Sequence, residues 1–222
     1  MSHPIKPDLK TEWLPVLLLI LSFGLAIYFY QSFPERVATH WGLDGQVNGY
    51  SSRGVAAFLL PGMALGMYLL FLVIPYFDPK KEQYAAFAPV YHRFKSLMVG
   101  FLSLLFVMMG LNGLGYTVDM GFWTPLLIGA LFIAIGWLLN KVKMNWFMGI
   151  RTPWTLSSET VWDKTHAASG KVFLLAGLLM AATVLAPGIG KIVLFILAIA
   201  ILVLALPIYS YYLYRQEKAG KK

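Results

Sequence analysis

Four ionisable side chains lie close together in the sequence between residues 151 and 166, where they could act as general acids and bases. Arg151, Glu159, Asp163 and His166 could meet at one surface and exchange protons. However, the sequence has no H-E-x-x-H, no G-x-S-x-G and no paired carboxylates at helical spacing within an apolar stretch. It also has no cysteine, which excludes a thiolate nucleophile. We therefore do not predict catalysis or a cofactor, and an enzyme using these four residues stays an alternative.

The same stretch predicts a docking surface. Gly149, with a proline shortly after it, indicates a fixed turn around Arg151. Ser157 or Ser158 can cap a following helix, in which Glu159 would occupy the first turn. Three residues of that helix would share one face: Trp162, His166 and Ser169. This face could bind a partner or pin the loop to neighbouring helices, and the spacing does not distinguish the two.

Residues 33–54 combine polar residues with glycines, which indicates a loop with tight turns. From Asp44 onward, oxygen-bearing side chains recur as in a calcium-binding loop, but Val55 replaces the final glutamate. Turn formation therefore explains Asp44 better than calcium does. His40, beside Trp41, could bind a metal or respond to pH, but no second ligand lies at a recognisable spacing. We expect a hydrogen-bonded structural role for it, and no metal.

Long uncharged stretches must position these loops. Six windows without Asp, Glu, Lys or Arg contain 19 to 24 residues each: 13–34, 54–77, 96–118, 120–140, 172–190 and 192–214. About 20 helical residues cross a hydrocarbon layer of about 30 Å. Lipid cannot satisfy backbone polar groups, so each window predicts a spanning helix. We predict an all-α integral membrane protein, a bundle of six transmembrane helices forming a single domain over residues 1–222.

The basic residues are divided unequally between the two sides of this bundle. Fifteen lie in the terminal tails and in the loops 78–95 and 140–171, against three on the other side. The positive-inside rule places the larger set, and both termini, in the cytoplasm, with the loop 33–54 outside. In so apolar a chain, a formal charge of +8 points to lipid headgroups. The lipid bilayer is therefore the expected partner, without direct nucleic-acid binding.

Four aromatic residues of the loop 78–95 recur at helical spacing: Tyr84, Phe87, Tyr91 and Phe94. With the basic residues around them, they could form a helix lying on anionic headgroups, or they could pack against the bundle. Pro89 is predicted to break or kink this helix.

Ionised side chains inside a membrane usually mark ion paths and proton relays. None of the six windows contains one. Proton-coupled or cation-coupled transport is therefore disfavoured, and a transporter of lipid or of a small apolar solute stays an alternative.

Two stretches of the chain resemble one known family. N-W-F-M-G-I-R-T-P-W-T-L at residues 145–156, followed by V-W-D-K-T-H at 161–166, resembles the SdpI family of bacterial immunity proteins. F-P-x-R-x-x-T-H-W at residues 33–41, followed by D-G and N-G-Y, is similar to an N-terminal module of uncharacterised function that often accompanies that family. The motifs and the six-span layout together cover nearly the whole chain.

The resemblance implies a multi-pass protein of the bacterial inner membrane that protects against a secreted, membrane-active peptide toxin. It also implies signalling, in which a small cytoplasmic repressor is held at the membrane. With Glu159 added from the helix start, the candidate partner-binding and signalling residues are Asn145, Gly149, Arg151, Thr152, Pro153, Trp154, Glu159, Trp162 and His166. The candidates of the outer loop are Pro34, Arg36, His40, Trp41, Asp44, Gly49 and Tyr50.

Overall fold

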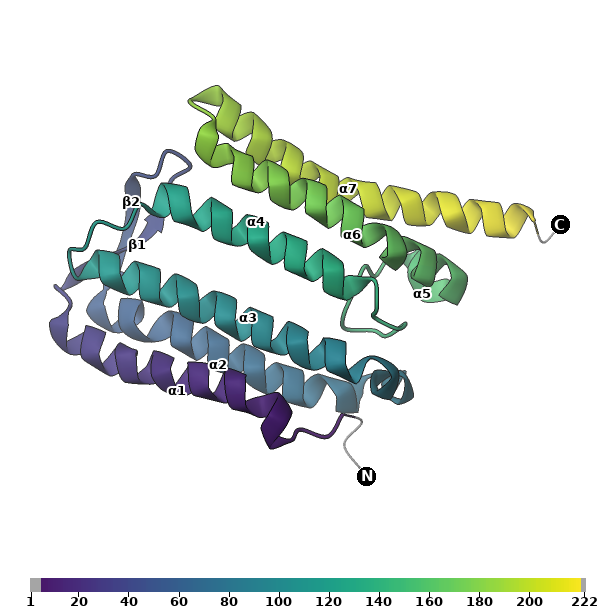
Figure 1. Ribbon diagram of the computed structural model, residues 1–222, viewed down its shortest axis with the longest axis horizontal. Coiled ribbons are helices and arrows are strands. Elements are labelled where there is room, and N and C mark those ends of the chain that lie inside the picture. The colour runs from purple at the N-terminus through teal and green to yellow at the C-terminus, as the bar shows by residue number, and fades with distance from the viewer. Residues whose placement is uncertain (1–4, 221–222) are drawn as a thin grey trace. The chain divides into compact units, whose positions relative to one another are not determined.

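Six long apolar helices make up most of the computed structural model, which describes residues 5–220 (Figure 1). They are α1 (Leu9–Ser32), α2 (Arg53–Phe77), α3 (Tyr84–Gly113), α4 (Met120–Leu139), α6 (Glu159–Ala182) and α7 (Ile189–Ala219). The shorter elements are β1 (Arg36–Trp41), β2 (Val47–Ser52), η1 (Lys81–Gln83), α5 (Pro153–Ser157) and η2 (Thr183–Leu185). Each long helix is long and apolar enough to cross a membrane. The predicted all-α, six-span membrane fold is confirmed, and a small antiparallel hairpin is added to it.

Five of the six long helices begin earlier than their uncharged windows, and α4 begins at the first residue of its window. α1 begins after Asp8, whose carboxylate accepts the Thr11 backbone N–H at 2.8 Å and completes a capping box. Glu12 therefore lies inside α1. α3 begins at Tyr84, so most of the range 78–95 is helix rather than loop, and Lys95 lies inside it. Both helices therefore extend past their uncharged windows and include ionised residues that lie outside those windows.

The chain divides into two compact units. Pro7–Leu72 and Lys95–Leu127 form the N-terminal unit. Val73–Phe94, with residues 5–6 and 128–220, forms the C-terminal unit.

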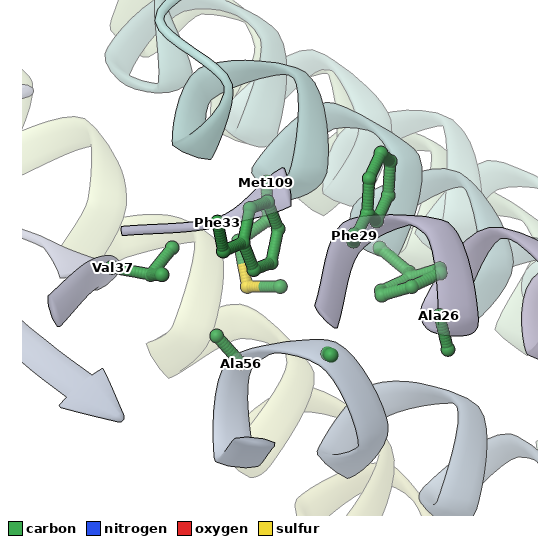
Figure 2. Packing of buried hydrophobic residues seen from close by; sticks show 8 residues of the cluster. Ala26, Phe29, Phe33, Val37, Ala56 and Met109 are labelled. Carbon is green, nitrogen blue, oxygen red and sulfur yellow. The ribbon is translucent and has the colours of Figure 1, made fainter. Parts of the chain in front are cut away.

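A cluster of buried side chains fixes the hairpin to the helices of the N-terminal unit. Its members are Ala26, Phe29, Phe33, Val37, Ala56, Ala57, Phe106 and Met109 (Figure 2). Phe29 stacks on Phe33 with ring centroids 5.1 Å apart and meets Phe106 edge-on at 5.3 Å. Val37 carries this packing into β1. The hairpin therefore starts from a fixed point at the end of α1.

The tip of the hairpin touches the first turn of α4. A Cβ added to Gly121 would lie 2.7 Å from the Gly45 Cα, a distance that only two glycines permit. Gly45 also has a φ of +81°, which favours glycine. Asp44 accepts the Gln46 backbone N–H at 3.0 Å, which is the turn chemistry expected of this residue. The hairpin is thus held at both its base and its tip.

The aromatic residues at the start of α3 are covered by protein. Tyr84, Phe87 and Tyr91 are exposed by only 0%, 1% and 2%. Their rings contact one another, with centroid distances from 5.0 to 6.3 Å. Of the two interpretations of this face, the structure therefore agrees with packing and not with a headgroup-facing surface. The helix is kinked at Phe87, two residues before Pro89, because proline removes a helical hydrogen bond.

Glycines bring α4 and α6 together in the C-terminal unit. A Cβ on Gly129 or on Gly177 would lie 2.6 Å from the other residue's carbonyl oxygen. Gly136 and Gly170 make a second close approach one heptad away on both helices. Small residues at such contacts let helices approach closely in a membrane, where packing replaces the hydrophobic effect. After η2, Gly188 adopts a φ of +52° and reverses the chain, so that α7 packs along α6 (Figure 1).

Candidate functional site

The connection between α4 and α6 is organised by one buried amide. Asn145 accepts the backbone N–H groups of Phe147 at 2.9 Å and Met148 at 2.6 Å. Its Nδ2 donates to the carbonyl oxygens of Lys143 and Met148, both at 2.9 Å. The side chain thus uses both donors and both lone pairs of its amide group. The loop around Asn145 is therefore a fixed structure rather than a free connection.

Gly149 lets this loop lie against α6. It has a φ of +120°, and a Cβ at this position would lie 3.1 Å from the Trp162 ring and collide with His166. The rings of Trp162 and His166 are stacked, with their centroids 4.0 Å apart. The two residues follow each other by one turn of α6. Trp162 Nε1 donates to the Val142 carbonyl at 2.8 Å. Glycine is therefore required here for both its backbone angle and its lack of a side chain.

The hydrogen bonds of His166 define its tautomer. Its Nε2 lies 3.0 Å from the Ile150 backbone N–H, which can only donate, so Nε2 must be the unprotonated nitrogen. Nδ1 lies 2.9 Å from the Trp162 carbonyl and must carry the proton. The ring is neutral in this arrangement, with both nitrogens occupied. His166 holds the Gly149–Ile150 backbone and has no nitrogen left for proton transfer.

The second half of the motif is fixed to α7. Thr152 caps α5 through a capping box with Thr155, and Pro153 occupies the first turn, where its missing N–H costs nothing. The Thr152 hydroxyl lies 3.0 Å from the Ser210 hydroxyl of α7. Trp154 packs on Tyr211 with centroids 5.0 Å apart. Of the two predicted caps of α6, Ser157 and Ser158, the structure uses Ser158, whose hydroxyl also donates to Glu217 at 2.6 Å.

Asp78, which the sequence analysis did not single out, joins two loops. It is 2% exposed, and its Oδ1 accepts the Lys80 backbone N–H at 2.8 Å. Its Oδ2 accepts the Tyr84 hydroxyl at 2.8 Å and the Trp146 backbone N–H at 2.9 Å. A buried carboxylate needs such donors because burial without them is costly. In the sequence, the only sign of this role was the position of the Asp78 carboxylate directly after the uncharged window 54–77.

The four residues of the proposed acid/base cluster have separate partners. Arg151 donates to the Trp146 carbonyl at 2.8 Å, and His166 is occupied by backbone groups. Glu159 lies 3.9 Å from Lys80, and Asp163 lies 3.9 Å from Lys143. Within residues 5–220, no hydrogen bond or ion pair joins any two of the four side chains. The structure therefore does not form the cluster.

The expected docking face of α6 is also covered. Trp162, His166 and Ser169 are exposed by 1% or less. The helical period grouped these residues correctly, but the loop carrying Gly149 closes over them. The accessible residues of the motif are different ones: Arg151, Pro153 and Glu159 are exposed, Trp154 is half-buried, and Trp146 and Phe147 are exposed by 50% and 40%.

The hairpin presents a paired polar face. Arg36 lies over the Tyr50 ring at 5.4 Å, and His40 Nδ1 contacts Asn48 Oδ1 at 2.5 Å. Gly49 is opposite His40 in the register, and a Cβ there would lie 2.9 Å from the His40 Cβ. The predicted structural role of His40 agrees with this hydrogen bond. Of the remaining candidates on the hairpin segment, Pro34 and Asp44 are exposed and Trp41 is half-buried.

A second ionised group was missed, in the N-terminal unit. Lys95 Nζ contacts both carboxylate oxygens of Glu12, at 2.5 and 2.7 Å, and the Tyr68 hydroxyl donates to Glu12 at 2.9 Å. Lys95 also lies 5.4 Å from the centroid of the Tyr68 ring. Lys95 is exposed by 1% and the Glu12 side chain by 12%. The group joins α3, α1 and α2, and no local pattern in the sequence shows this.

Six membrane-spanning helices and a packed connecting loop define a multi-pass protein of the bacterial inner membrane. Residues 141–210 match the SdpI/YfhL protein family, and residues 17–65 match a domain of unknown function, DUF1648. The Immunity protein SdpI of Bacillus subtilis (strain 168) is 27% identical over 206 residues, which cover 92% of this chain and 97% of that protein. The resemblance to the SdpI family is therefore confirmed, together with the N-terminal module. No solved structure matches this chain.

Proposed function

We propose that this chain is a membrane immunity protein that protects its cell against a secreted, membrane-active peptide. The supporting observation is the similarity to the Immunity protein SdpI, which extends over 92% of this chain and 97% of the relative. Similarity of that length cannot arise from the composition of one apolar helix. It includes residues 141–210, the region matched by the family, where the loop held by the hydrogen bonds of Asn145 and His166 lies.

The peptide would be met at the hairpin. In the orientation that the basic residues favour, β1 and β2 face the outside of the cell. Arg36, Tyr50, His40 and Asn48 form exposed cross-strand pairs there. Because the hairpin is held at its base by Val37 and at its tip by the Gly45–Gly121 contact, its polar face needs little ordering when a ligand binds.

A signal to a small cytoplasmic repressor would leave through the loop between α4 and α6. Arg151, Pro153 and Glu159, with the aromatic rings of Trp146 and Phe147, are the side chains that a partner can reach. The buried members of the candidate set support the loop from beneath. We therefore divide the predicted signalling residues into contact residues and residues that hold the loop.

Neither alternative function gains a specific observation. An enzyme using Arg151, Glu159, Asp163 and His166 would need these groups close together, and each has its own partner. The second alternative, a transporter of lipid or of a small apolar solute, gains no support from the buried ionised groups, because Glu12 and Lys95 neutralise each other.

Protection is tested by expressing the chain in a bacterium that a secreted peptide toxin kills. We expect cells carrying the wild-type chain to grow at toxin concentrations that stop cells carrying an empty vector. Tyr50→Ala in the hairpin should reduce protection, whereas Arg151→Ala in the loop should keep it and lose membrane recruitment of the repressor. Sensitivity equal to the vector control, with the wild-type chain present in the membrane, would count against immunity.

The orientation is tested separately. A reporter active only in the cytoplasm, fused after Trp154, should be active, and the same reporter fused after Asp44 should be inactive. The reverse pattern would place the loop between α4 and α6 outside the cytoplasm, where a cytoplasmic repressor could not bind it. It would leave the immunity test unaffected, because growth does not depend on the reporter.

A further inference from the structure

Two cations converge on one exposed tryptophan at the end of α4. Trp137 lies in the last turn of this helix and is 54% exposed. Lys141 Nζ lies 4.5 Å from the centroid of its ring, and Arg93 Cζ lies 6.0 Å from the same centroid. All three residues belong to the C-terminal unit. The two positive charges therefore share one aromatic ring, at the level where an apolar helix reaches the membrane surface.

These cations have no acidic partner in the part of the chain that the structure describes. Two nearby lysines do have one, since Lys143 lies 3.9 Å from Asp163 and Lys80 lies 3.9 Å from Glu159. The Trp137 indole N–H also has no hydrogen-bond acceptor among residues 5–220. The arrangement thus offers a guanidinium, an ammonium and an indole donor without any anion to receive them.

We propose that Arg93, Lys141 and Trp137 bind the phosphate of an anionic phospholipid. A phosphodiester supplies the negative charge and the acceptor oxygens that these groups lack, and guanidinium binds phosphate oxygens well. The indole ring suits the adjoining layer, because tryptophan prefers the boundary between headgroups and acyl chains. The occupant is a lipid rather than free phosphate, since the site borders the apolar surface of α4.

The chain offers a closely matched control on α7. Arg215 lies 5.9 Å from the centroid of the Tyr211 ring, and Lys218 lies 5.6 Å from that of Tyr214. This pair also consists of one arginine and one lysine over aromatic rings, but each cation has a separate ring, and both rings lie on α7. Removing it takes away the same charge without removing a site where two cations converge.

The test uses the full chain in nanodiscs containing phosphatidylglycerol and phosphatidylcholine, with retained lipids measured by native mass spectrometry. A basic residue near an anionic surface contributes about fivefold to binding, so Arg93→Gln with Lys141→Gln should weaken phosphatidylglycerol retention about 30-fold. Arg215→Gln with Lys218→Gln should change it by less than about threefold. Arg93→Lys with Lys141→Arg should retain binding, because it keeps both charges.

Three results would overturn the proposal. Equal losses in the two neutralised pairs would show only a general attraction to an anionic surface. Loss of binding in the charge-conserving exchange, with the protein still monodisperse, would show that the residues act through packing. Displacement of phosphatidylglycerol by millimolar inorganic phosphate would identify free phosphate as the occupant.

Discussion

The buried group of Glu12, Lys95 and Tyr68 allows a quantitative test of what holds α1, α2 and α3 together. Lys95→Met leaves the Glu12 carboxylate buried, where it still accepts hydrogen bonds from the Tyr68 and Thr11 hydroxyls. Glu12→Leu leaves the Lys95 ammonium, 1% exposed, beside the Tyr68 ring. In both variants one charge loses its counter-charge in a region of low dielectric constant.

The expected cost follows from this geometry. Unit charges about 4 Å apart interact by about 4 kcal/mol at an effective dielectric constant of about 20, and removing one partner of a buried pair typically costs about 3–5 kcal/mol. We expect each single variant to lower the free energy of unfolding by about that amount. The double variant Glu12→Leu with Lys95→Met should be within about 1 kcal/mol of the wild type, because two apolar side chains leave no unpaired charge.

The assay is a double-mutant cycle in which the purified protein is unfolded in mixed micelles and followed by circular dichroism. Lys171→Met is the matched control, because it removes an exposed helical lysine and should change the free energy by less than about 0.5 kcal/mol. Tyr68→Phe should cost about 1.5–3 kcal/mol, the value of a hydrogen bond to a charged acceptor. Additive losses, with the double variant worse than either single variant, would refute the idea that these charges act as one buried pair.

Three further substitutions test the contacts of the loop and the helices. Asp78→Asn should lower the free energy of unfolding by about 1–3 kcal/mol, because an amide cannot accept all of the Lys80, Tyr84 and Trp146 donors. An unchanged thermal midpoint in detergent would contradict the role of Asp78 in joining the two loops. Gly149→Ala should cost at least about 1–3 kcal/mol through its positive φ and change the near-ultraviolet circular dichroism of the tryptophans, and an unchanged spectrum would contradict the close approach to α6. Gly177→Leu should prevent the approach of α6 to α4 and reduce the folded yield, whereas Gly24→Leu, where a Cβ meets nothing within 4 Å, should not; equal yields would argue against the glycine contact.

The spanning helices could be predicted from the sequence because apolar length is a local property. A run of about 20 uncharged residues must satisfy its own backbone in lipid, whatever its neighbours are. The family resemblance was likewise carried by contiguous motifs. The predicted break or kink near Pro89 and the cap at Ser157 or Ser158 also depend only on nearby residues, and the structure shows a kink and a cap at Ser158.

The starts of α1, α3 and α6 were placed too late in the chain because charge alone was used to find them. Glu12 and Lys95 are 83 positions apart in the chain, and each looks like the end of an apolar window. Only the packing of α1 against α3 shows that the two charges neutralise each other and can lie within the helices. Pairing over such a distance leaves no signal in a local pattern.

The sequence by itself determined the number of spans, their apolar character and the resemblance to one family, because these depend on composition and on contiguous motifs. It also placed Trp162 and His166 on one face of a helix, since a period of 3.6 residues is enough for that. The tertiary structure alone decided that this face is closed, because its cover comes from Gly149 and Val142 in another segment. It also decided that Asp78 joins two loops, since a buried carboxylate is identified by its donors, and those come together only when the chain has folded.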